Sequence, residues 1–66
     1  MPEKWTGELI GRMHNARVSF VDLANALGVS KAYVSMVLNG VRKPVGMREK
    51  METALDALIA EREREQ

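Results

Sequence analysis

The stretch SFVDLANALGVSKAYVSMVL, residues 19–38, decides the fold, because two short helix patterns follow one another in it with only a tight turn between them. Its first half repeats apolar residues at the spacing of one helix face, and these residues are Phe20, Leu23, Ala24 and Leu27. Ser19 is placed to cap this helix, and Asp22 takes the partner position of a capping box. Gly28 should end the helix, because glycine enters the left-handed conformation without a Cβ penalty.

The second helix pattern begins directly after this glycine. Ser30 offers another N-cap, so we expect a helix over 31–38 that ends at Asn39 and Gly40. The turn between the two helices is then about three residues long, which is the length found in helix-turn-helix units. The alternative is an ordinary pair of packed helices inside a bundle, without any reading function.

Seven residues of this stretch, together with LNGVRKP at 38–44, resemble the phage repressor and Cro-type helix-turn-helix family, and they are Leu23, Ala24, Gly28, Val29, Ser30, Val34 and Val37. The resemblance covers about two thirds of the chain. It implies an all-α fold, namely a small bundle of four to five helices with a central helix-turn-helix, as in lambda-repressor-like DNA-binding domains. It also implies one domain over residues 1–66, which binds operator DNA and usually pairs as a dimer.

The remaining helices are expected from apolar spacing on both sides of this unit. Trp5, Leu9 and Met13 recur every four residues and predict a first helix that ends near Asn15. Trp5 is then a core anchor or lid, with stacking on a nucleobase as the alternative. A last helix is expected over about 47–62, and its apolar residues fall within an arc of about 140°. That arc is wide enough for the core and, at one edge, for a homodimer contact through Leu55, Leu58 and Ile59.

The charges are divided unevenly, although the formal net charge is only +1. No acidic residue occurs between positions 22 and 49, whereas four basic residues do, and they are Lys31, Arg42, Lys43 and Arg48. This pattern favours a polyanionic partner. The absence of cysteine excludes disulfides and thiolate metal sites, and no signal peptide or apolar span of membrane length is seen, so we expect a soluble cytoplasmic protein without membrane contact.

Enzymatic activity is not expected from this sequence. There is one histidine, no paired acidic residues in an acid/base arrangement and no glycine-rich phosphate loop. We therefore predict no catalytic residue, no metal, no cofactor and no small-molecule ligand.

The resemblance places Lys31, Ala32, Ser35 and Met36 at positions that meet base edges in the major groove. Contacts to phosphates are expected from residues that flank this helix or lie along its edge, and these are Arg17, Ser19, Tyr33, Asn39, Arg42 and Lys43. Where this chain has Phe20, the family commonly carries a glutamine whose side chain contacts the DNA backbone. Phe20 cannot form a hydrogen bond, so this contact is lost and the side chain should pack inward.

The predicted function is a sequence-specific regulator of transcription, a repressor that binds a palindromic operator in double-stranded DNA as a homodimer. Two copies would read half-sites about 34 Å apart. The alternative is a protein-interaction module, antitoxin-like or anti-repressor, which keeps the helical fold but does not read DNA. Weak polarity of the reading helix favours this alternative, and the acid-free stretch argues against it.

Overall fold

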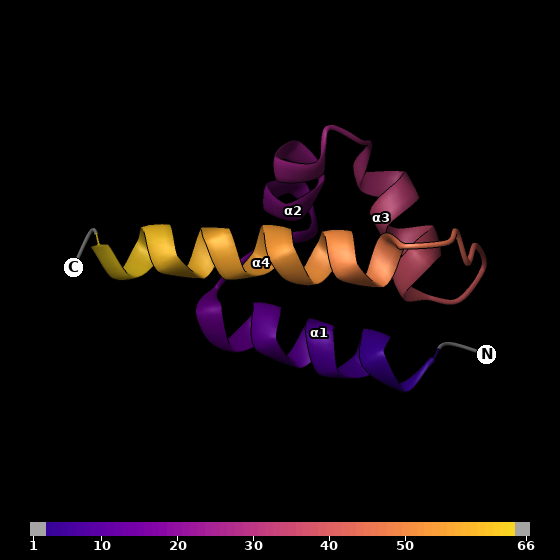
Figure 1. Cartoon of the computed structure of the whole chain (residues 1–66), viewed down its shortest axis with the longest axis horizontal. Coiled ribbons are helices and arrows are strands. Elements are labelled where there is room, and N and C mark those ends of the chain that lie inside the picture. The colour runs from indigo at the N-terminus through magenta and orange to yellow at the C-terminus, as the bar shows by residue number, and fades with distance from the viewer. Residues whose placement is uncertain (1–2, 65–66) are drawn as a thin grey trace.

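The computed structural model describes residues 3–64, and these residues form four α-helices without a strand. They are α1 (Lys4–Ala16), α2 (Phe20–Leu27), α3 (Lys31–Leu38) and α4 (Met47–Arg64). In Figure 1, α4 runs along the long axis, with α1 on one side and the α2–α3 pair on the other. The all-α class is therefore confirmed. Four to five helices were expected, and residues 3–64 form four.

The first turn of α2 is held by the capping box that the sequence predicts. The Ser19 Oγ accepts a hydrogen bond from the Asp22 backbone N–H, and the Asp22 Oδ2 accepts one from the Ser19 backbone N–H, both at 3.0 Å. Gly28 ends the helix in the left-handed conformation, with φ of 74°. A side chain at Gly28 would be strained by this φ, so glycine is required here for conformational reasons.

The turn from α2 to α3 spans only residues 28–30. The Val29 N–H donates to the Ala24 carbonyl at 3.0 Å, and the Ser30 Oγ accepts from the Tyr33 N–H at 3.0 Å. Both helix ends are thus closed by local hydrogen bonds, which restricts the angle between α2 and α3. At the other end of α3, Gly40 has φ of 80°, in agreement with a helix end at Asn39 and Gly40.

All four helices and the segment between α1 and α2 contribute to one hydrophobic core. Its buried residues are Leu9, Met13, Val18, Leu23, Ala24, Val34, Val37, Leu38, Met47, Met51 and Leu55. Phe20 and Trp5 are half-buried and pack against this core. Phe20 thus packs inward as expected, and Trp5 covers the core from the start of α1.

The position of α4 corrects one predicted dimer contact. Leu55 has no exposed surface and belongs to the core of the bundle, in which α4 packs against both α1 and α2. The prediction that Leu55 contacts a second copy is therefore wrong. Leu58 and Ile59 are half-buried and pack against the edge of the core.

Two long-range ion pairs fix α4 to the rest of the bundle. Arg12 of α1 contacts Asp56, and the Arg62 Nη2 lies 3.1 Å from the Asp22 Oδ2 at the start of α2. Between residues 3 and 64, none of the helices combines the length and the apolar character that a membrane crossing requires.

Candidate nucleic-acid interface

The start of α3 presents two of the four predicted base-contact residues to solvent. Lys31 and Ala32 occupy its first turn and are both exposed. The Ser30 Oγ accepts a hydrogen bond from the Tyr33 N–H and so caps this turn, which gives the helix a defined first residue. Lys31 contacts no carboxylate within residues 3–64, and its ammonium group is available to an external acceptor.

The other two predicted base-contact residues, Ser35 and Met36, are half-buried on the next turn of α3. The Ser35 Oγ accepts a hydrogen bond from the Asn39 Nδ2 at 3.1 Å. A residue expected at a base and a residue expected at a phosphate are thus bonded to each other. Asn39 remains exposed, but this bond directs its amide along α3.

The loop between α3 and α4 is held against the end of α3. The Val41 and Arg42 backbone N–H groups both donate to the Met36 carbonyl, at 2.9 and 3.2 Å. Arg42 and Lys43 follow directly and are exposed, as a phosphate contact requires. Because the loop is bonded to α3, these two cations have a fixed position relative to the predicted reading helix.

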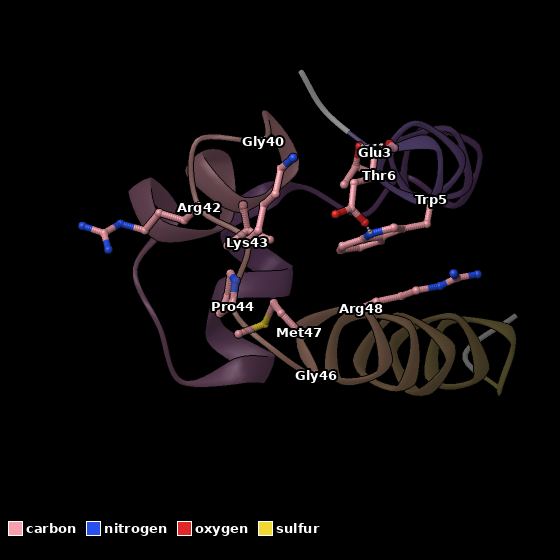
Figure 2. Close-up of a pocket in the computed structure, with 11 residues that line it drawn as sticks. Glu3, Trp5, Thr6, Gly40, Arg42, Lys43, Pro44, Gly46, Met47 and Arg48 are labelled. Atoms are coloured by element: carbon pink, nitrogen blue, oxygen red, sulfur yellow. Dashed lines mark hydrogen bonds between the residues drawn. The ribbon is translucent and has the colours of Figure 1, made fainter.

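A cavity of about 200 Å³ separates this loop from the start of α1 (Figure 2). Figure 2 shows the Trp5 indole across the cavity from Lys43 and Pro44, while the Arg42 side chain points away from it. The Trp5 Nε1 donates to the Glu3 carboxylate at 2.6 Å. Trp5 is therefore engaged within the domain, which fits a lid better than a platform for a nucleobase.

The junction of α1 and α2 carries Arg17 and Ser19. Arg17 is exposed and adopts the left-handed conformation with φ of 59°, which the sequence did not indicate. Ser19 is also exposed, but its N–H and one acceptor site of its hydroxyl are occupied by the capping box. Tyr33, the remaining predicted phosphate contact, is half-buried and packs against the core.

Asp22 is the charged group at this junction that sequence reasoning did not include in the site. Hydrogen bonds from Ser19, its backbone N–H first, hold the pKa of the Asp22 carboxyl below its ordinary value, and Arg62 adds to this effect. A carboxylate at the N-terminus of α2 occupies the place where a phosphate would otherwise bind to the helix dipole. We therefore expect Ser19 to be a weaker phosphate contact than Arg17.

The ion pairs divide the basic residues into two groups. Arg12, Arg48 and Arg62 each contact a carboxylate that belongs to α2 or α4, with Arg48 lying 3.4 Å from Glu52. In the part of the chain that the structure describes, the other seven have no such contact, and they are Lys4, Arg17, Lys31, Arg42, Lys43, Lys50 and Arg64. Lys31 in α3 and Arg42 and Lys43 directly after it are therefore positive charges without a carboxylate partner, whereas Arg17 lines a hollow with Arg62 and Glu63 near the C-terminal end of α4.

The arrangement offers cationic and hydrogen-bonding groups but no metal site, since no group of three potential ligands from His, Cys, Asp or Glu occurs among residues 3–64. Comparison of the chain with protein-family models, with curated proteins and with solved structures found no match.

Proposed function

We propose that this protein is a sequence-specific DNA-binding regulator in which α2 and α3 form a helix-turn-helix unit of the lambda-repressor-like kind. The observation that carries the proposal is the segment of α3 and the following loop, which contains no acidic residue and exposes three basic side chains. Lys31, Arg42 and Lys43 in this segment have no carboxylate partner within residues 3–64. Basic side chains left unpaired on one face are the expected electrostatic footprint of a nucleic-acid partner.

In this proposal α3 enters the major groove with its first turn foremost. The major groove is about 12 Å wide and admits an α-helix, whose diameter with side chains is about 10–12 Å. Lys31 donates to guanine O6 and N7, and Ala32 contacts a thymine methyl group. Ser35 and Met36, which are half-buried, contact the edges of bases one turn further along.

Phosphate contacts then fix the register of α3 in the groove. Arg42 and Lys43 bind the backbone beside the end of α3, and Arg17 binds it from the α1–α2 junction. Such contacts position the protein but carry no sequence information directly. With a single long polar side chain at the bases, we infer that groove shape contributes much of the specificity.

We further propose that two copies bind a palindromic operator and that the protein acts as a repressor. One unit makes few base contacts, and a second copy on a half-site about 34 Å away doubles the number of bases that are read. The rival proposal is a protein-interaction module. The half-burial of Ser35 and Met36 favours it, because these side chains offer little polar surface to bases.

Selection of bound duplexes from a random pool tests the proposal. We expect enrichment of a motif with two inverted half-sites whose centres lie about 10 base pairs apart. Affinity for the enriched duplex should fall steeply with salt, because each neutralised phosphate adds about −0.9 to the log–log slope. A pool that shows no enrichment at low salt, together with salt-independent weak binding, would support the interaction module instead.

A further inference from the structure

The cavity between the α3–α4 loop and the start of α1 is formed by three segments that meet only in the folded chain. These segments are the start of α1, the end of α3 with the loop that follows it, and the start of α4. The cavity volume is about 200 Å³. Pockets for drug-sized ligands measure about 300–1,000 Å³, so this cavity suits a smaller molecule. Because the segments are far apart in the sequence, the sequence alone predicts no small-molecule ligand.

Apolar side chains form much of the wall of this cavity. Val37 and Met47 line it and are buried members of the core. Pro44 and the Trp5 indole are half-buried and stand on facing sides (Figure 2). A wall of this kind favours a ligand with an apolar part, because small-molecule sites combine apolar surface with a few placed polar groups.

The carboxylate of Glu3 lines the cavity from the α1 side. Its Oε2 accepts a hydrogen bond from the Trp5 Nε1 at 2.6 Å, and the Glu3 carbonyl accepts one from the Thr6 Oγ1, also at 2.6 Å. Thr6 is buried, so these bonds give Glu3 a defined place. Within residues 3–64 no basic side chain pairs with the Glu3 carboxylate, which can therefore accept a further hydrogen bond.

Three basic residues also line the cavity, and they differ in how much charge they present to it. Arg48 lies 3.4 Å from the carboxylate of Glu52, and the Arg42 side chain points away from the cavity (Figure 2). Lys43 has no carboxylate partner within residues 3–64, and it lies on the side of the cavity opposite Glu3. The cavity thus has an unpaired ammonium on one side and an unpaired carboxylate on the other.

The loop backbone that carries Lys43 is restrained on both sides of this residue. The Arg42 N–H donates to the Met36 carbonyl at 3.2 Å, and the Met47 N–H donates to the Pro44 carbonyl at 3.4 Å. A site whose backbone is already ordered loses little conformational entropy when a ligand binds. The two charged groups therefore stand on a largely preformed frame.

We propose that this cavity binds a small zwitterion, namely an α-amino acid with an apolar side chain. The ligand carboxylate accepts a hydrogen bond from the Lys43 ammonium, and the ligand ammonium donates to the Glu3 carboxylate. The ligand side chain packs against the apolar wall. A plain acid would be repelled by Glu3 and a plain amine by Lys43, whereas a zwitterion forms charge-assisted hydrogen bonds with both.

A ligand in this cavity would act on DNA binding through Lys43. This step rests on the proposed DNA-binding function, in which the same ammonium contacts a phosphate. The ligand carboxylate and the phosphate compete for this group, so each weakens the binding of the other by the same factor. The amino acid therefore promotes release of the protein from DNA.

Trp5 is the one tryptophan of the chain and lines the cavity, so its fluorescence reports ligand binding in the absence of DNA. The probes are leucine, methionine and phenylalanine, each titrated to about 10 mM, since ligands this small commonly bind in the millimolar range. We expect a saturable change with at least one of them. Its analogues that lack the ammonium or the carboxylate group should bind at least about tenfold more weakly, the effect of one charge-assisted hydrogen bond.

Three single variants locate the two charged contacts. Lys43→Ala should weaken amino-acid binding about tenfold, whereas Arg42→Ala is the matched control and should keep the wild-type affinity, because Arg42 points away from the cavity. Glu3→Gln keeps an oxygen for the Trp5 N–H and should abolish the preference for the amino acid over its ammonium-free analogue. That loss of selectivity is a result that a merely structural role of Glu3 would not produce. All three side chains are exposed, so we expect folded variants, as checked by circular dichroism.

The anisotropy of a labelled, selected duplex tests the competition with DNA. A saturating concentration of the amino acid should weaken DNA binding by the wild type at least about fivefold. The same concentration should leave DNA binding by Lys43→Ala unchanged, because this variant has no ammonium for which ligand and phosphate compete.

The absence of a saturable fluorescence change with all three amino acids would overturn the inference, whether or not the protein binds DNA. Equal binding of the amino acid and its analogues would also overturn it, as would an equal loss of affinity in Arg42→Ala and Lys43→Ala. Ligand binding that leaves DNA affinity unchanged would support the cavity site and overturn the competition. A chain that binds the amino acid but no duplex would support the cavity site and overturn the proposed function.

Discussion

Replacing Arg42 and Lys43 together by alanine should weaken DNA binding through the loss of two phosphate contacts per copy. Both side chains are exposed and neither contacts a carboxylate in residues 3–64. Each neutralised phosphate contributes about −0.9 to the slope of log affinity against log salt. The slope should therefore become shallower by about 1.8 for one copy and about 3.6 for two copies.

The measurement is the anisotropy of a labelled duplex, titrated at salt concentrations from about 50 to 200 mM. The affinity should fall comparably on selected and unselected duplexes, because phosphate contacts do not distinguish bases. The double variant Arg12→Ala/Arg64→Ala is the matched control, since it makes the same change in net charge. Arg12 contacts Asp56 between α1 and α4, and Arg64 is the last residue of α4.

The reasoning depends on the location of the two cations rather than on the total charge. An equal change of slope in both double variants would show that only net charge matters. A slope that stays the same after loss of Arg42 and Lys43 would remove these residues from the interface. Either result would refute the assignment of the loop as a phosphate contact.

Three further changes give distinct outcomes. Lys31→Ala should relax the preference at one base position and cost about 1–3 kcal/mol, as measured by competition among single-base operator variants; an equal loss on all duplexes would assign Lys31 to phosphate. Leu55→Ala should lower the free energy of unfolding by about 2–5 kcal/mol in urea without altering pairing on DNA, because its side chain is buried in the domain's own core. The pKa of Asp22 is lowered in the folded chain, so its contribution to stability is present above pH 3.8 and is lost as the pH falls further. Thermal unfolding of Asp22→Asn should accordingly show less loss of stability below that pH than the wild type. Parallel curves of stability against pH for the two proteins would contradict this role of Asp22.

Local signals in the sequence were sufficient to predict where α2 begins and ends and where α3 begins. Ser19 and Asp22 form the capping box, Gly28 adopts the left-handed conformation, and Ser30 caps α3. Each of these features depends on hydrogen bonds or backbone angles within a few residues. They can therefore be predicted without knowledge of the tertiary structure.

The burial of Leu55 was harder to predict, because the apolar arc of α4 does not show which of its edges lies against the bundle. Leu55 lies within the arc and is fully buried. The packing of α4 on both α1 and α2 decides this, and that packing joins residues far apart in the chain. The spacing of apolar residues predicts a helix and its apolar face, but it does not predict how many neighbouring helices cover that face.

The pairing of Asp22 with Arg62 could not be predicted from the sequence either, because forty residues separate the two side chains. Asp22 has a complete local role in the capping box, so its sequence context gave no sign of a second partner. The same holds for Arg12 and Asp56. The electrostatic surroundings of the α2 N-terminus therefore became visible only in the folded chain.

The Met36 carbonyl, which receives two backbone N–H groups from the loop, has a thermodynamic consequence for recognition. A segment already ordered in the unbound protein has little conformational entropy left to lose when a ligand arrives. The same restraint prevents the loop from adapting independently of α3, so a duplex with a different groove width would misplace both at once. If the protein binds DNA as proposed, the rigidity at this one carbonyl links the strength of binding to the shape of the duplex.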